Sequence, residues 1–246
     1  MIAPIYRAGA ALKLLRIPEL ALTTGFCPLC SGRRPFVRLR KDEIAVRCLG
    51  CGASPITLSM VEVIRDLPLH RLQVYELSAR GPLFAYLNRS AARLITSEYL
   101  PGVTPGEIRD GVRHEDVQAL SFPDHSFDLC TSTEVLEHVP DDARAMREIR
   151  RVLKPGGSFV FTVPLDLHTP TLERARLKPD GQIEHLHPPE HHIDPARGGT
   201  AILAFRNYGA DILERLHDAG FDRAEIRMPQ PLPWAYQRPV IIASGG

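Results

Sequence analysis

Residues 127–164 read FDLCTSTEVLEHVPDDARAMREIRRVLKPGGSFVFTVP, and this stretch decides the fold class. The apolar run at 127–133 predicts a buried strand. The pattern over 141–153 predicts an amphipathic helix, whose apolar face comprises Ala143, Met146, Ile149, Val152 and Leu153. The segment KPGG (154–157) ends that helix, and 157–164 predicts a second buried strand. Two buried strands joined by a helix indicate a parallel β–α–β unit.

The same alternation extends in both directions from this unit. Further strands are expected at 71–77, 92–99, 111–116, 221–228 and 239–244, and further helices at 59–67, 82–91 and 208–220. Ser59 is the expected N-cap of the first helix, and Pro82 lies in the first turn of the second. This order predicts an α/β fold with a Rossmann-like, mainly parallel, seven-stranded sheet and helices on both faces. Such sheets bind ligands outside the carboxyl ends of their strands.

The charge distribution divides the chain into two unlike parts. The 246 residues include 30 Lys and Arg and 29 Asp and Glu, and their net charge of +1 excludes a protein that binds nucleic acid through bulk charge. Residues 1–51 nevertheless carry a net charge of +6, and the remainder carries −5. We therefore expect a basic N-terminal domain at 1–58 and a larger domain at 59–246.

Four cysteines organise the basic part. Cys27 and Cys30 form one CxxC pair, and Cys48 and Cys51 form another, with 17 residues between the pairs. This spacing is typical of a structural zinc ribbon with a closed shell of four thiolates. The intervening RPFVRLRKDEIAVR (34–47) predicts a hairpin. Two disulfides are the alternative, and the fifth cysteine, Cys130, is expected in the core.

The N-terminus contains an apolar patch interrupted by Lys13 and Arg16. It therefore does not match a signal peptide, and the chain has no apolar run long enough to span a membrane. The patch predicts a short amphipathic helix, either docked on the protein or touching a membrane surface. The expected location is the cytoplasm.

Three separated motifs carry a resemblance to one family. They are ALSFPDHSFD (119–128), EVLEHVPD (134–141) and RVLKPGG (151–157). In this order and spacing they resemble class I S-adenosylmethionine-dependent methyltransferases with a type 11-like domain, over about residues 71–227. The resemblance implies a methyltransferase (EC 2.1.1.-) that uses S-adenosylmethionine.

The resemblance also implies where the cofactor binds. The strand ending at Glu76 precedes the family's ExGxGxG loop, which reads Glu76-Leu77-Ser78-Ala79-Arg80-Gly81-Pro82 in this chain. Small Ser78 and Ala79 and flexible Gly81 permit close approach of the backbone, whereas Arg80 either projects away or touches the cofactor carboxylate.

The other expected cofactor residues follow later strands. Glu98 ends the second strand and is suited to accept both ribose hydroxyls, with Tyr99 beside it. Asp116 and Val117 match the family's adenine-binding positions. Thr133, with Thr131, is expected at the methionine end.

The acceptor side has candidate acid–base groups. Glu134, Glu137 and His138 stand at i, i+3 and i+4, and His138 is the first choice for general base because its reference pKa suits neutral pH. An alternative is a second divalent metal, held by these three residues and a histidine from 185–192. This grouping resembles the metal site of small-RNA 2′-O-methyltransferases and some ubiquinone-pathway O-methyltransferases, and its ligands suit Mn, Fe or Zn better than Mg.

Four of the ten histidines lie in one stretch of eight residues, His185, His187, His191 and His192. They belong to the long segment 165–207, which we expect to form the acceptor pocket and lid. Candidate acceptor contacts in it are Arg174, Arg176, His185, His187 and Arg206.

The preferred function is O-methylation of a small polar, sugar or natural-product-type acceptor. One alternative is an RNA methyltransferase whose ribbon binds phosphates through Arg33, Arg34, Arg38 and Arg40. The other, which follows from the altered loop, is a catalytically inactive binding protein with a methyltransferase fold. The sequence leaves the acceptor atom and the oligomeric state open.

Overall fold

The computed structural model describes residues 17–194 and 200–246. Most of the N-terminal segment expected to form an amphipathic helix lies outside these residues. The described chain forms two compact units, one made of residues 17–67 and 228–240 and the other of the remaining residues. The predicted boundary after residue 58 falls within helix α2 (Pro55–Ile64), which belongs to the first unit. The division into functional domains at that boundary stays a prediction.

The first unit is built on a small antiparallel sheet. Its strands lie in the order β1 (Ala21–Cys27), β2 (Gly32–Arg38) and β3 (Val46–Cys48). The predicted hairpin is confirmed, because β2 pairs with β3 with Phe36 opposite Cys48. Three short 3₁₀ helices accompany the sheet, η1 (Ile17–Glu19), η2 (Glu43–Ala45) and η6 (Pro233–Ala235).

The core of this unit draws on both of its chain segments. Phe36 and Leu58 are fully buried, and Leu232 from the returning segment packs with them. The prediction of Ser59 as helix cap is wrong, because α2 begins at Pro55 with Ser54 as N-cap. Proline suits the first helical position, and Ser59 is buried within the helix, where its hydroxyl accepts a hydrogen bond from the Arg238 amide at 3.2 Å.

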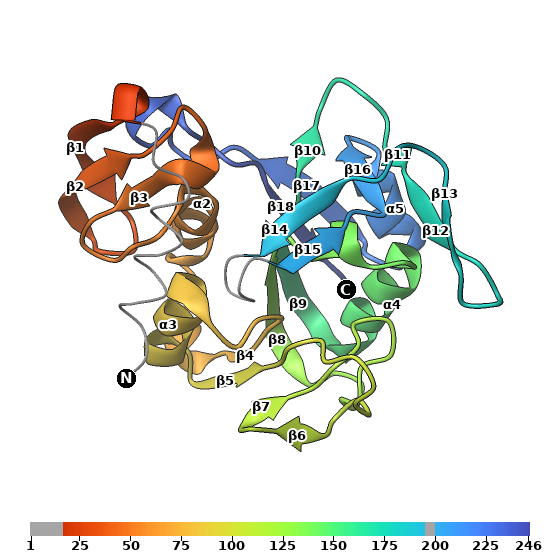
Figure 1. Ribbon diagram of the computed structural model, residues 1–246. Coiled ribbons are helices and arrows are strands. Elements are labelled where there is room, and N and C mark those ends of the chain that lie inside the picture. The colour runs from red at the N-terminus through yellow and green to blue at the C-terminus, as the bar shows by residue number, and fades with distance from the viewer. Residues whose placement is uncertain (1–16, 195–199) are drawn as a thin grey trace. The chain divides into compact units, whose positions relative to one another are not determined.

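The second unit contains the expected α/β sheet, but with six strands in the described residues where seven were predicted (Figure 1). Their order is β17 (Arg223–Arg227), β18 (Val240–Ser244), β9 (Leu153–Thr162), β8 (Phe127–Thr133), β4 (Gln73–Glu76) and β5 (Arg93–Thr96). The four strands from β9 to β5 are parallel, and β18 runs antiparallel to β9. Figure 1 shows helix α3 (Gly81–Ser90) on one side of β8 and β9 and helix α4 (Asp142–Val152) on the other.

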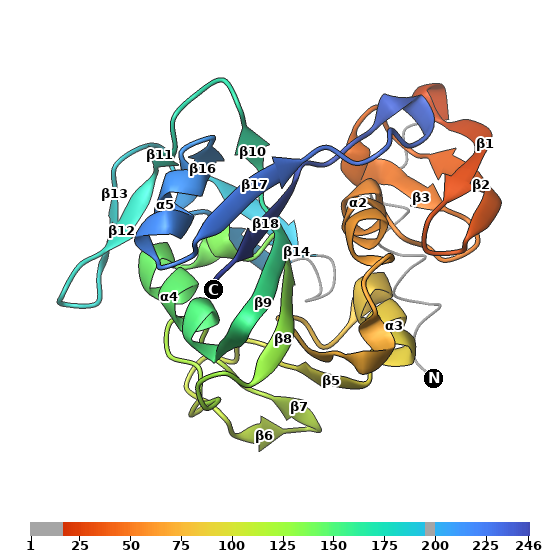
Figure 2. The same cartoon turned by 180° about the vertical axis from the view of Figure 1, so that it is seen from behind.

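The remaining elements connect or extend this sheet. The helical ones are η3 (Leu69–Arg71), η4 (Leu136–His138) and α5 (Ile212–Asp218), and Figure 2 shows α5 on the same side as α4. The short strands are β6 (Ile108–Arg109), β7 (Val112–Arg113), β10 (Leu165–Asp166), β11 (Leu172–Glu173), β12 (Ala175–Leu177), β13 (Ile183–His185), β14 (His191–Asp194), β15 (Thr200–Leu203) and β16 (Arg206–Gly209). No helix among the described residues is long and apolar enough to cross a membrane.

In the central β–α–β unit, β8 and α4 agree closely with their predictions, whereas β9 begins at Leu153 and includes the predicted turn at 154–157. Strand β8 has the predicted bounds, and Cys130 in it is fully buried, as expected of a core residue. Helix α4 begins after Asp141, whose carboxylate accepts the Arg144 amide at 2.9 Å. Its buried face includes Ala145 where Ala143 was predicted, and Ala143 is exposed.

The strand predicted at 111–116 is not a full strand of the sheet. In its place, β6 and β7 form a hairpin, and only a single parallel bridge joins Glu98 to His114. The reason is local. Asp110 and Gly111 form the two-residue connection with φ values of 50° and 75°, the backbone that an Asp-Gly hairpin turn adopts.

Two of the recognised motifs are locked together by a pair of basic side chains. Arg151 donates to the carbonyl oxygens of Leu120 and Phe122 at 2.9 and 2.8 Å and pairs with Asp124 at 2.7 Å. The Lys154 ammonium lies 2.9 Å from the Asp128 carboxylate. These contacts hold the loop before β8 against the end of α4.

We predict that Arg151→Met lowers the free energy of unfolding by about 1–2 kcal/mol, because it leaves two carbonyl groups and the carboxylates of Asp124 and Glu148 without this donor. Urea unfolding measures the change. Arg147→Met, an exposed position on the same helix, serves as control, and equal effects of both variants would contradict the proposed locking role.

Candidate functional site

The carboxyl ends of the four parallel strands meet at one edge of the sheet. Glu76 at the end of β4 lies level with Thr96 of β5 and Thr131 of β8, and Thr133 lies level with Thr162 of β9. Most of the predicted site residues belong to these ends or to the loops that follow them. This edge is where parallel α/β sheets bind ligands.

Glu76 is a buried acid at this edge. Its side chain is 1% exposed, and its carboxyl group accepts a hydrogen bond from the Thr131 hydroxyl. Burial, with a further contribution from the charge of Glu98, raises the pKa of Glu76 to about 8. The group is therefore largely protonated at neutral pH.

Glu98, the predicted ribose-binding carboxylate, accepts hydrogen bonds from the predicted cofactor loop. Ser78 and Ala79 both donate to Glu98 Oε1, from the hydroxyl at 3.3 Å and from the amide at 3.1 Å. The structure thus brings these three predicted residues together. Arg80 also donates to the same oxygen, which the sequence did not suggest.

The other predicted cofactor residues lie around this loop and the chain after β5. Gly81 begins α3 with a φ of 94°, a conformation that suits glycine. The Tyr99 ring is 51% exposed and lies 5.5 Å from the His114 ring. Asp116 accepts from the Gln118 amide at 2.9 Å, while Val117 is buried in the core. Their contact with adenine stays a prediction.

A second cluster lies beyond the end of β8. It consists of Glu137 and His138 on η4 and His192 on β14, whose ligand atoms all lie within 4.8 Å of one another. Glu137 is fully buried, and neither of its carboxylate oxygens has a hydrogen-bond partner among the described residues. His138 Nε2 and His192 Nδ1 lie 3.6 and 3.7 Å from Glu137 Oε1. A buried carboxylate in this position needs a cation beside it.

The outer nitrogens of both rings are fixed by acceptors. His138 Nδ1 lies 2.8 Å from the Leu203 carbonyl, and His192 Nε2 lies 3.1 Å from Glu190 Oε1. Because a carbonyl or carboxylate only accepts, these ring nitrogens carry the protons. In the neutral rings, the two lone pairs therefore face Glu137. The carboxylates of Glu137 and then Glu190 raise the pKa of His192. A protonated His192 is therefore an alternative to a metal ion as the positive charge beside Glu137.

Glu134 lies outside this cluster. It adopts a positive φ of 52° at the end of β8, so the three acidic and imidazole residues do not form one helical face. Its catalytic role stays a prediction. Of the four neighbouring histidines, only His192 joins the cluster in the described residues, and the other three are exposed.

Two of the arginines expected to contact the acceptor have other roles. Arg206 is 3% exposed and donates to the carbonyls of Val139 and Pro140, at 2.6 and 2.8 Å, just after η4. Arg174 donates to Asn207 at 3.1 Å and lies 3.4 Å from Glu190. Both support the segment that bears the cluster.

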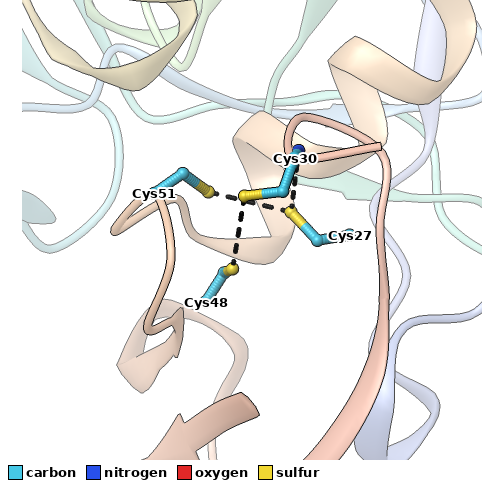
Figure 3. A group of neighbouring side chains, drawn as sticks. All are labelled: Cys27, Cys30, Cys48 and Cys51. Carbon is cyan, nitrogen blue, oxygen red and sulfur yellow. Dashed lines mark hydrogen bonds between the residues drawn. The ribbon is translucent and has the colours of Figure 1, made fainter. Parts of the chain in front are cut away.

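The four cysteines of the first unit converge on one point (Figure 3). All are free, and the sulfur–sulfur distances are 3.7 Å for Cys27–Cys51 and 4.0 Å for Cys30–Cys48. A disulfide would require ~2.05 Å. Four thiolates in a tetrahedron around zinc, at ~2.3 Å from the ion, lie about 3.8 Å apart. The contact between Cys27 and Cys51 lowers the pKa of Cys51 to about 5 and raises that of Cys27.

Comparisons with known proteins agree with this fold. A family profile described as a methyltransferase domain matches residues 48–161, less than half of the chain. The chain is 45% identical over 58 residues to 2-methyl-6-phytyl-1,4-hydroquinone methyltransferase from Synechocystis, covering 24% of this chain and 18% of that protein. It is 33% identical over 139 residues to a sterol 24-C-methyltransferase from Aspergillus fumigatus, covering 52% and 33% respectively.

A solved structure assigned as an S-adenosylmethionine-dependent methyltransferase from Listeria monocytogenes matches with a TM-score of 0.51 at 15% identity. The match covers 76% of this chain and 96% of that one. Residues 48–161 are thus similar to a methyltransferase domain, and the second unit shares its α/β fold with the solved structure. The chain spans only about a fifth to a third of the length of the two curated relatives. One of these relatives is named for a hydroquinone and the other for a sterol.

The raised pKa of Glu76 predicts a pH effect on stability. Folding disfavours ionisation of Glu76. Its protonated form therefore contributes fully to the free energy of unfolding below pH 4.5, the ordinary pKa of the unfolded chain, and this contribution is lost as pH rises through the folded pKa of about 8. Between pH 5 and 9 this group lowers the free energy of unfolding by up to about 4 kcal/mol. We expect Glu76→Gln to remove that loss, and urea unfolding at both pH values measures it. Exposed Glu214→Gln is the control, and an unchanged pH profile in Glu76→Gln would refute the assignment.

Proposed function

We propose that this protein is an S-adenosylmethionine-dependent methyltransferase that methylates a hydroxyl group of a small polar, sugar or natural-product-type acceptor. The cofactor supplies a methyl group activated by its sulfonium sulfur. The methyl carbon bonds to the acceptor oxygen, the carbon–sulfur bond breaks with its electron pair kept by the sulfur of S-adenosylhomocysteine, and the hydroxyl proton passes to a base or to water. The observation that carries the proposal is that the Glu98 carboxylate follows β5 and that Glu137 and His138 follow β8 at the same sheet edge, where His192 of β14 joins the latter two.

The cofactor residues are proposed from their chemistry. Glu98 offers a nearly buried carboxylate to ribose hydroxyls, and the loop with Ser78, Ala79 and Gly81 offers close backbone approach beside it. Glu76, Tyr99, Asp116, Val117 and Thr133 complete the proposed cofactor site. Methyl transfer depends mainly on alignment of donor and nucleophile, so rigid placement of this loop is the main task of these residues.

On the acceptor side, we propose that Glu137, His138 and His192 hold a divalent metal. The donor set fits, because the buried Glu137 carboxylate, which has no hydrogen-bond partner in the described part of the chain, faces two imidazoles whose outer nitrogens have acceptors. Two imidazoles and one carboxylate suit Mn, Fe or Zn. Such a metal, when bound, lowers the pKa of a coordinated hydroxyl. His138 acting directly as general base is the competing role, since coordination through Nε2 would exclude it.

In the first unit, we propose a structural zinc ion held by Cys27, Cys30, Cys48 and Cys51. The sulfur spacing supports this set, and four thiolates leave no open position for catalysis. Because the core of the unit is small, the ion would supply much of its folding free energy.

The RNA-binding alternative receives less support from the ribbon. Of the four arginines considered, Arg38 stacks over Trp234 at 5.1 Å and Arg40 pairs with Asp42 within the same unit. Arg33 and Arg34 are exposed. A small acceptor therefore stays the preferred partner, and a cytoplasmic location stays an expectation.

Calorimetry with S-adenosylhomocysteine, the demethylated product, tests the enzyme assignment. We expect the protein to bind it, and Glu98→Gln to weaken binding by at least about tenfold because hydrogen bonds to a charged acceptor are lost. Exposed Glu107→Gln is the control and should bind like the unchanged protein. Absence of heat at millimolar ligand would reject the methyltransferase and favour the inactive binding protein.

Metal analysis of the purified protein separates the two proposed metals. We expect one zinc and a second divalent ion per chain, with Glu137→Gln losing only the second. The control His191→Ala changes an exposed neighbouring histidine and should retain both. Cys48→Ser should lose the zinc and destabilise the first unit. A single metal in both the unchanged protein and Glu137→Gln would rule out the second site and leave His138 as the proposed base.

A further inference from the structure

The carboxylate of Glu98 is already engaged by its own protein. Three donors meet its Oε1 atom, the Arg80 guanidinium at 3.0 Å, the Ala79 amide at 3.1 Å and the Ser78 hydroxyl at 3.3 Å. The Glu98 side chain is only 8% exposed, so it can be approached from few directions. All three donors come from the loop that a nucleoside ligand would have to approach.

These donors leave little room at that oxygen. A carboxylate has about four lone-pair sites over its two oxygens, so three donors saturate one of them. A ribose whose two hydroxyls each donate to one oxygen of Glu98 must therefore replace one of the three donors at Oε1. The Ala79 amide is fixed by the backbone and the Ser78 hydroxyl is small, whereas the Arg80 side chain is long and 45% exposed. Arg80 is the donor that can leave at the lowest cost.

Arg80 also has a reason to be there in the free protein. Glu98 lies close enough to Glu76 for its charge to raise the pKa of that buried acid. A guanidinium on Glu98 offsets the charge of a carboxylate that is nearly buried beside another acid. Arg80 itself is the N-cap of α3 with an extended backbone, a φ of −152°, and a smaller residue there introduces no strain.

We propose that Arg80 is an internal competitor for the nucleoside part of the cofactor and thereby sets cofactor affinity. In the free protein its guanidinium occupies the Glu98 oxygen that a ribose hydroxyl would use, and binding requires that it move away. The inference rests on the proposed function, because it takes Glu98 as the ribose-binding group. It predicts that loss of this arginine tightens binding, the reverse of what a direct contact with the cofactor carboxylate would give.

Calorimetry with two ligands tests this role. Adenosine carries the ribose without the methionine carboxylate, and S-adenosylhomocysteine carries both. We expect Arg80→Ala to bind both ligands about two- to fivefold more tightly, the range of a partly exposed ion pair. Arg80→Lys retains the charge and should stay near the unchanged protein. Arg89→Ala removes another arginine of α3, which lies over Tyr86, and should have no effect.

The outcomes separate this inference from the proposed function. Weaker binding of S-adenosylhomocysteine with unchanged adenosine binding would mean that Arg80 holds the cofactor carboxylate, and the inference would be wrong. Equal affinities in Arg80→Ala and the unchanged protein would also overturn it, while leaving the methyltransferase proposal intact. No heat in any variant would overturn both.

Discussion

Three carboxyl groups buried at one edge of the central sheet impose the main constraint on this structure. Glu76, Glu98 and Glu137 are 1%, 7% and 0% exposed, and a buried carboxylate is stable only when protonated or paired. Each is accommodated differently. Burial favours the protonated form of Glu76, Glu98 draws in a loop and an arginine, and Glu137 faces two imidazoles. The chemistry available at this edge follows from how each negative charge is balanced.

The segment after β9 is organised by the same requirement. Arg206 lies beneath η4, donates to the backbone that follows it, and pairs with Glu173 at 3.1 Å and Asp142 at 3.6 Å. Arg215 joins the same two carboxylates. This partly buried network fixes the turn that bears Glu137 and His138 relative to β16 and α5. An arginine that the sequence suggested as a ligand contact thus supports the site through the backbone.

Local patterns were sufficient for the central elements and insufficient for the site. The continuous apolar run of β8 and the amphipathic face of α4 are visible in the sequence because burial imposes a period on it. His192 could not be chosen among its neighbours, since its place depends on β14 pairing with β15 beyond an intervening segment. The contact between Arg80 and Glu98 also joins residues on different strands' loops, and no local pattern encodes it. The Asp-Gly pair at 110–111 is a sequence signal for a hairpin turn, and the chain forms this turn in place of the strand predicted at 111–116.

The first unit obtains Leu232 and Trp234 from a segment that follows almost the whole second unit in the chain. During synthesis from the N-terminus, the cysteine pairs and both of their strands emerge long before this segment does. The first unit therefore lacks part of its core while the second unit is being made. The last side chains of the first unit's core are made just before β18, the strand that pairs with β9 in the second unit. Completion of the two units is thus tied to one short stretch of translation, although their cores are separate.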